Sequence, residues 1–186
     1  MKKSALVAVR FSPARESAPP AVVLSGSLRM RLALFQPDIP QNLGAAVRLG
    51  ACLGVPLEII EPCAFPLSDR AIRRAAMDYG QNAVVTRHDG WSDFLSDPAR
   101  ADGRLVLFTT RGAQNFTGFA FQPGDTLLFG QESAGAPEHV HAAAQARLVI
   151  PLRPPARSLN IITAAAMALG EALRQTDGFP SLGQNG

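Results

Sequence analysis

The sequence predicts an α/β protein, with a mostly parallel β-sheet that carries helices on both faces. Short apolar segments typical of buried strands alternate with helical segments along residues 30–175. With 186 residues, 47% of them hydrophobic, the chain is long enough for one well-buried domain and too short for two full ones. The apolar stretches are interrupted well before the roughly 20 residues that a transmembrane helix needs, so we expect no membrane span.

The predicted elements follow one another in a regular order. Runs rich in Leu, Ile, Val and Phe predict strands over residues 31–36, 57–61, 82–86, 104–109, 126–129 and 147–150. Helices are predicted over residues 42–53, 69–76, 91–95, a short stretch after Pro137, and 158–175. Ligands of such sheets bind beyond the carboxyl ends of the strands, so we expect the functional site there.

The first 29 residues differ from the rest in composition and charge. They carry a net charge of +4, whereas the remaining 13 Arg and 14 Asp and Glu give −1. We interpret residues 1–29 as an N-terminal extension that is disordered or a non-native start, with an organellar targeting peptide as the alternative. A single domain is then expected over residues 30–180, with a tail at 181–186. Any affinity for RNA must come from local clusters of arginine.

Cysteine and histidine give no indication of a metal site. Cys52 and Cys63 match no spacing of metal ligands, and we expect both to be reduced and structural in a cytoplasmic protein. His139 and His141 are two residues apart on a predicted helix and therefore point in different directions. We expect both histidines to be exposed rather than to bind a metal.

A first motif follows the first predicted strand. Two prolines in residues 37–40 favour an extended turn, and Asn42 is in position to cap the following helix. Arg48 lies on the first turns of that helix, where a guanidinium can bind a phosphate or orient a ribose hydroxyl. A capped helix with a solvated arginine is the ordinary alternative.

The second motif begins where the strand 126–129 ends at Gly130. The loop that follows offers backbone N–H groups and one carboxylate, that of Glu132, and Pro137 then opens a short helix. A carboxylate there can hold a hydroxyl group or favour a cationic sulfonium. The alternative is that Glu132 merely caps the next helix.

The third motif is a proline-rich loop that leads into the last helix. Arg153 and Arg157 flank the prolines and are candidates for phosphate contacts. Ser158 is in position to cap the helix, and Asn160 follows it.

Together, residues 42–48, 129–135 and 157–160 resemble the motifs of the SPOUT superfamily in its SpoU branch. The most similar members are the tRNA wobble-nucleotide 2′-O-ribose methyltransferases. The resemblance extends from Met30 to about Pro180 and includes residues 60–62 and 73–79. It implies a C-terminal trefoil knot, S-adenosylmethionine as the cofactor, and a homodimer in which the partner subunit completes the active site.

The resemblance also implies a role for individual residues. The expected cofactor-binding residues are Phe108, Thr109, Gly130, Ile150, Ser158, Leu159 and Asn160. The expected catalytic residues are Arg48, Glu132 and Asn160, and the expected substrate-binding residues are Asn42, Arg48, Arg153 and Arg157. Many relatives carry an arginine at the position of Ala134, so binding of the phosphate or substrate there is either weaker or supplied by Arg153 or Arg157.

The function implied is methyl transfer from S-adenosylmethionine to the ribose of the first anticodon nucleotide, a cytidine or a modified uridine. S-adenosylhomocysteine is the product, the anticodon stem-loop of tRNA is the partner, and neither a metal nor a membrane is needed. Two alternatives remain: 2′-O-methylation of another tRNA or rRNA ribose, and a knotted RNA-binding protein without catalysis. A protein that binds a dinucleotide would need G-x-G-x-x-G after the first strand, and residues 37–44 do not provide it.

Overall fold

The computed structural model describes residues 29–68, 72, 83–112 and 114–181. Within these residues, seven strands form one sheet in the order β3-β2-β1-β6-β4-β7-β5, and every neighbouring pair is parallel. The strands are β1 (Arg31–Phe35), β2 (Leu57–Ile60), β3 (Val85–His88), β4 (Leu105–Phe108), β5 (Gln114–Asn115), β6 (Thr126–Phe129) and β7 (Ala146–Val149). The predicted parallel sheet is therefore confirmed.

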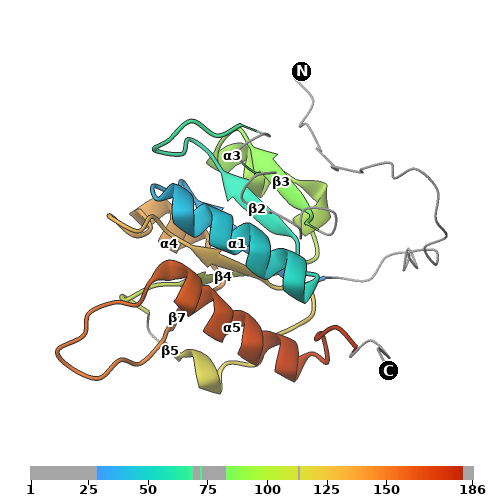
Figure 1. Ribbon diagram of the computed structural model, residues 1–186. Coiled ribbons are helices and arrows are strands. Elements are labelled where there is room, and N and C mark those ends of the chain that lie inside the picture. Colours follow the sequence, from blue (N-terminus) through green and yellow to red (C-terminus); the bar gives the residue numbers. More distant parts are fainter. Residues whose placement is uncertain (1–28, 69–71, 73–82, 113, 182–186) are drawn as a thin grey trace, which may run out of the picture.

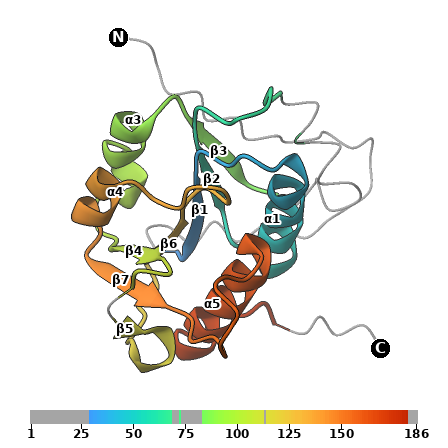
Figure 2. The ribbon, with the colours of Figure 1, turned by 90° about the vertical axis from the view of Figure 1, so that its left-hand side faces the viewer.

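Helices cover both faces of this sheet, as predicted. α1 (Pro40–Leu53) and α5 (Ile161–Gln175) lie side by side on one face, and α3 (Trp91–Leu95) and α4 (Glu138–Ala143) lie on the other (Figures 1 and 2). α1 begins with a proline, whose fixed φ suits a first turn, and ends before Gly54 in the left-handed conformation (φ 67°). Short 3₁₀ helices occur at Pro98–Arg100 and Phe116–Gly118.

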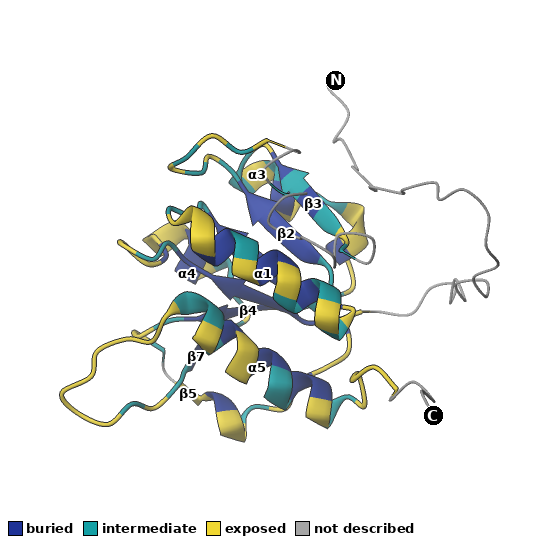
Figure 3. Cartoon of the chain, viewed as in Figure 1, coloured by how far each residue is buried: buried dark blue, intermediate teal, exposed yellow. Residues whose placement is uncertain are grey.

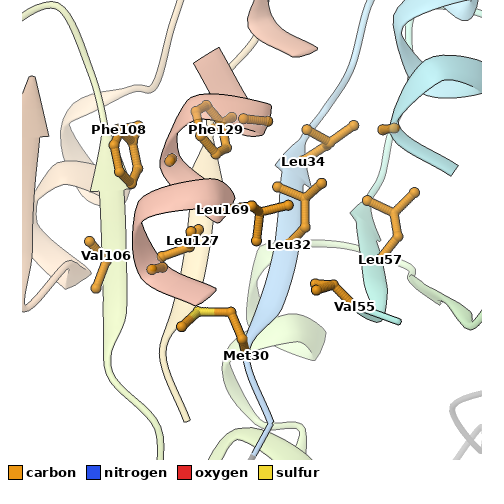
Figure 4. Packing of buried hydrophobic residues seen from close by; sticks show 14 of the residues in the cluster. Met30, Leu32, Leu34, Val55, Leu57, Val106, Phe108, Leu127, Phe129 and Leu169 are labelled. Carbon is orange, nitrogen blue, oxygen red and sulfur yellow. The ribbon is translucent and has the colours of Figure 1, made fainter. Parts of the chain in front are cut away.

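The strands β1, β2, β4 and β6 are buried, and their side chains alternate between two hydrophobic clusters (Figure 3). On the α1 and α5 side, Leu32, Leu34 and Leu127 pack with Leu169 of α5 (Figure 4). On the α3 and α4 side, the cluster consists of residues from several strands, one residue from each helix and one from the loop before α4: Ala33, Phe35, Ile60, Leu105, Leu107, Leu128, Phe94, Val140 and Ala136. Because both faces are buried, the strands read as continuous apolar runs.

One strand of the sheet carries a fully buried carboxylate. Glu58 of β2 accepts a hydrogen bond of 2.8 Å from Nη1 of Arg31, and its other oxygen lies 3.4 Å from Nε2 of His88. Burial raises the pKa of Glu58, but the contacts with His88 and Arg31 outweigh it and lower the pKa overall. The charge is thus compensated where β1, β2 and β3 lie side by side.

Several predicted boundaries were wrong. α1 begins two residues before residue 42, α5 begins at Ile161 rather than 158, and β3 occupies Val85–His88 rather than 82–86. Between the strands predicted over 104–109 and 126–129, where no element was predicted, the chain forms β5 and a 3₁₀ helix. Apart from Ile72, the helix predicted over 69–76 lies outside the described residues, as do residues 1–28 and 182–186 of the predicted extension and tail. In the part of the chain that the structure describes, no helix is long and apolar enough to span a membrane.

Candidate functional site

A cavity of about 810 Å³ opens beyond the carboxyl ends of β4, β6 and β7. Four segments line it: 108–111 after β4, 129–136 after β6, parts of the loop 149–161 that leads into α5, and Ile39 and Asn42 at the start of α1. The sequence predicted this location from the topology of parallel sheets. Almost the whole loop 151–160 is exposed, and Figure 3 shows it extending from the body of the protein.

The cavity brings together all seven residues that the resemblance assigned to cofactor binding. These are Phe108, Thr109, Gly130, Ile150, Ser158, Leu159 and Asn160. Phe108 stacks on Phe129 with the ring centroids 5.0 Å apart and the planes 11° apart, and so forms an apolar wall. Their individual roles stay predictions, but one cavity contains them all.

The segment after β6 folds back tightly on itself. Gln131 and Gly135 exchange two backbone hydrogen bonds of 3.0 and 2.9 Å, and Gly135 has a φ of 71°. A Cβ atom on Gly130 would lie 2.4 Å from the carbonyl carbon of Gly135 and 2.5 Å from the nitrogen of Ala136. This position therefore requires glycine because the backbone of the returning segment occupies the space.

Three polar side chains from three distant segments form a chain of hydrogen bonds at the cavity. Asn42 donates through Nδ2 to Oε1 of Glu132 at 3.0 Å, and Asn160 donates through Nδ2 to Oδ1 of Asn42 at 3.0 Å. The Oδ1 atom of Asn160 accepts from the backbone N–H groups of Ile162 and Thr163 and caps α5. Each amide thus has a fixed orientation.

This network corrects two predicted helix caps. Asn42 does not cap α1, because it lies inside the helix and its side chain binds Glu132 and Asn160; the N-cap position belongs to Ile39. Ser158 does not cap α5, because the helix begins three residues later and Asn160 is its N-cap. Glu132 likewise contacts Asn42 and the backbone N–H of Asp38 rather than the next helix.

Asp38, which sequence analysis did not single out, supports the Glu132 segment. Its carboxylate accepts from the backbone N–H groups of Glu132 (3.1 Å) and Ser133 (3.2 Å) and from the Ser133 hydroxyl. The side chain of Glu132 and the bonds from Ser133 lower the pKa of Asp38 to about 2. Burial, and then the interaction with Asp38, raise the pKa of Glu132. As the pH falls, Glu132 therefore takes up a proton before Asp38 does.

The depressed pKa makes the stabilisation by Asp38 acid-sensitive. The carboxylate is ionised in the folded protein down to about pH 2, whereas its ordinary pKa is 3.8. Its contribution is therefore present above about pH 4 and is lost as the pH falls towards about 2. We expect urea unfolding to show a large stability gap between wild type and Asp38→Asn at about pH 5 and a smaller gap at about pH 2.5. An equal gap at both values would contradict this assignment.

The predicted arginines are distributed differently. Arg157 lines the cavity, whereas Arg153 lies on the exposed loop outside the lining. Arg48 is exposed on the outer side of α1 and does not line the cavity of its own chain. Among the described residues, no three His, Cys, Asp or Glu side chains are grouped to hold a metal ion.

Sequence reasoning missed two further residues near the cavity, Arg111 and His141. Arg111 lines the cavity directly after β4, and its position beyond a predicted strand end was the signal that could have identified it. The expectation of two exposed histidines was wrong for His141, which is buried against Arg111, and correct for His139. Both cysteines are free, although Cys52 is exposed rather than buried.

The chain is similar in sequence to one family of known proteins. A profile of the SpoU rRNA methylase family matches residues 29–170. A protein of Beijerinckia indica, named tRNA (cytidine(34)-2′-O)-methyltransferase, is 58% identical over 144 residues, which cover 77% of this chain and 90% of the relative. Proteins with the same name from Ancylobacter novellus and Escherichia coli K12 are 54% and 38% identical, covering 84% and 81% of this chain and 99% and 96% of their own lengths.

Solved structures agree in fold. One, which concerns the 2-OH methylation of C/U34 on tRNA, superposes with a TM-score of 0.73 at 41% identity and covers 81% of this chain and 97% of its own. An rRNA methyltransferase from Sinorhizobium meliloti with AdoMet bound superposes with a TM-score of 0.68 at 25% identity, covering 78% of this chain and 56% of its own.

Proposed function

The chain belongs to the SpoU rRNA methylase family, and we propose that it is an S-adenosylmethionine-dependent enzyme that methylates the ribose 2′-oxygen of tRNA nucleotide 34. The observation that carries this proposal is the cavity, where three distant motifs meet and Glu132, Asn42 and Asn160 are bonded in series. The names of the relatives support the nucleotide, and the AdoMet-bound relative supports the cofactor.

The residues of the cavity fit S-adenosylmethionine. Its volume of about 810 Å³ lies in the range of roughly 300–1,000 Å³ typical of small-molecule sites. Phe108 and Ile150 offer apolar surface for adenine, and Thr109 and Ser158 offer hydroxyl groups. We expect the trefoil knot implied by the resemblance to form around this cavity.

When bound, S-adenosylmethionine supplies a methyl group on a positively charged sulfur that leaves as the neutral thioether of S-adenosylhomocysteine. The new bond forms between the ribose 2′-oxygen and the methyl carbon, so the hydroxyl must give up its proton. Glu132 is suited to accept this proton, because burial and Asp38 raise its pKa. Asn42 and Asn160 hold the carboxylate in one orientation, which favours alignment of the hydroxyl.

Arg48 fits this mechanism only if it acts on a second copy of the chain. It lies outside its own cavity, on the exposed side of α1. We therefore propose a homodimer in which Arg48 of each subunit orients or helps to deprotonate the ribose hydroxyl at the other subunit's cavity. Arg153 and Arg157, on the exposed loop beside the cavity, are placed to contact the phosphates of the anticodon stem-loop. We expect the enzyme to act in the cytoplasm.

The outer faces of α1 and α5 support the homodimer. These helices lie next to each other, and their exposed side chains are mainly small or apolar, including Ala45, Cys52, Ala166 and Met167 (Figures 1 and 3). Met167, in the middle of α5, is 43% exposed and lies next to the exposed Ala166. Such a surface permits close approach of a second helix pair.

Replacing Met167 with glutamate is expected to convert the dimer into a monomer, because the variant would bury unpaired carboxylates in the interface. Sedimentation velocity measures the oligomeric state, and circular dichroism checks that the monomer is folded. Leu95→Glu is the matched control, because it introduces the same charge at an apolar side chain that is 45% exposed on α3, on the other face of the sheet, and it should leave the dimer intact. A dimeric Met167→Glu protein would exclude this interface.

The decisive experiment for the function is mapping of ribose methylation in total tRNA from cells with and without the gene. Loss of one 2′-O-methyl group at nucleotide 34 is the expected result, and purified enzyme should restore it with S-adenosylmethionine. Loss at another tRNA or rRNA ribose would keep the enzyme class and change the target. No change anywhere, together with RNA binding in vitro, would favour the non-catalytic alternative.

A further inference from the structure

Arg111 and His141 meet beside the cavity, although no sequence motif links them. Arg111 lies in the segment after β4 and lines the cavity, whereas His141 lies on α4 and is not part of the lining. The Nη2 atom of Arg111 is 3.0 Å from Nε2 of His141 and donates to the carbonyl oxygen of Ala136 at 3.0 Å. These two contacts hold one nitrogen of the guanidinium against α4 and the residue that precedes its N-cap.

The contact with Arg111 determines the protonation state of His141. A guanidinium can only donate, so Nε2 of His141 must accept and the imidazole must be neutral, with its proton on Nδ1. His141 is 5% exposed. Burial and the charge of Arg111 lower the pKa of His141, and Arg147 of β7 acts in the same direction, whereas Glu138 of α4 opposes them. The neutral form is thus favoured in the folded protein.

The rest of the guanidinium remains available to a ligand. The Nε and Nη1 atoms of Arg111 have no hydrogen-bond partner within the described part of the chain, and the side chain is exposed where it lines the cavity. The segment that carries Arg111 packs closely against β7 at Gly112, where an added Cβ atom would lie 2.5 Å from the backbone of Leu148. The donors are consequently held in position by backbone packing and by His141.

We propose that Arg111, oriented by the neutral imidazole of His141, binds an anionic oxygen group of a ligand in this cavity. An arginine with fixed orientation and free donors suits a carboxylate or a phosphate. Under the proposed function, on which this inference rests, the group is either the carboxylate of the methyl donor's methionine portion or a phosphate of the RNA. Arg111 is then a binding residue, and His141 is its positioning residue.

Calorimetry with Arg111→Gln distinguishes the two sources of the anion. If Arg111 binds the donor's carboxylate, the variant should bind S-adenosylhomocysteine about tenfold more weakly or worse and bind 5′-methylthioadenosine, which lacks the carboxylate, as wild type does. If it binds RNA phosphate, S-adenosylhomocysteine should bind normally. The affinity of Arg111→Gln for an anticodon stem-loop RNA should then fall. The slope of log affinity against log salt concentration should also decrease in magnitude by about one.

Two controls separate this inference from the proposed function. Arg174→Gln removes an arginine that pairs with Glu171 and does not line the cavity, and it should bind every probe as wild type does. If wild type binds S-adenosylhomocysteine and the RNA while Arg111→Gln binds both within about twofold of it, the inference about Arg111 is wrong and the proposed function stands. If wild type binds neither probe, both fail.

The pH dependence of ligand affinity tests the role of His141. Protonation of Nε2 removes the acceptor and places a second cation beside Arg111. Because the pKa of His141 is lowered from its ordinary 6.5, the affinity of wild type for the affected probe should fall only as the pH drops below about 6.5. His141→Gln retains a neutral acceptor and should bind with little dependence on pH, whereas His141→Leu should bind weakly throughout. Thermal melts show which variants are folded at each pH. Wild-type affinity in a folded His141→Leu protein would overturn the positioning role.

Discussion

Replacing Arg48 with alanine is expected to reduce the rate of methyl transfer by about a hundredfold or more while leaving S-adenosylhomocysteine affinity unchanged. The reason is that Arg48 lies outside the cavity that would hold the cofactor in its own chain. Under the proposed mechanism it contacts only the ribose, and only in the other subunit. Single-turnover rates with a tRNA transcript and calorimetry with the cofactor product test the two halves of this expectation.

Mixing two inactive variants shows from which subunit Arg48 acts. Arg48→Ala and Glu132→Gln should each be nearly inactive alone. If each site combines Arg48 of one subunit with Glu132 of the other, a mixed dimer contains one intact site. Random reassociation makes half of the dimers mixed, so about a quarter of wild-type activity should return. Glu132→Gln preserves the size of the side chain and retains one of its two acceptor oxygens, which limits the effect on the fold. No recovery after verified subunit exchange would place Arg48 and Glu132 in the same subunit's site.

Replacing Gly130 with alanine is expected to abolish cofactor binding and to destabilise the protein by about 1–3 kcal/mol. The added Cβ would lie within 2.7 Å of three backbone atoms of Gly135 and Ala136, which cannot rotate away as a side chain can. The segment 129–136 must therefore open, and it lines the cavity and carries Glu132. Calorimetry with S-adenosylhomocysteine and urea unfolding measure the two effects.

Gly118→Ala is the matched control for this substitution. Gly118 ends the 3₁₀ helix Phe116–Gly118, and nothing lies within 4 Å of a Cβ added there. The same chemical change should therefore leave both cofactor affinity and stability close to wild type. Cofactor binding by Gly130→Ala equal to that of Gly118→Ala would mean that the segment does not hold the ligand.

The fold was largely predictable because the burial of a strand is visible in its amino-acid sequence. Each central strand is buried on both faces and therefore reads as an apolar run, and the intervening helices force parallel pairing. β5 escaped prediction because Gln114 and Asn115 are exposed and polar, and only pairing with β7 makes them a strand. The start of α5 was misplaced because Ser158 and Asn160 are equally good caps locally, and the bond to Asn42 favours Asn160.

The candidate site was predictable wherever its residues follow strand ends within recognisable motifs. The cavity contains Gly130, Glu132 and Asn160 together, as the order of the three motifs indicated. The motifs did not include Asp38 and His141, because each acts through a neighbour that is distant in sequence. Asp38 binds the segment of Glu132, and His141 binds Arg111.

The class of fold, the edge of the sheet that bears the site and the family resemblance all follow from local features of the sequence. These features are patterns of hydrophobicity and short motifs, which do not depend on distant parts of the chain. The role of each polar side chain, by contrast, depends on the assembled fold. Asn42 binds Glu132 instead of capping a helix, His141 is neutral and buried, and Arg48 faces away from its own cavity. Hydrogen bonds and burial depend on which atoms meet in space, and that is fixed only when the whole sheet is assembled.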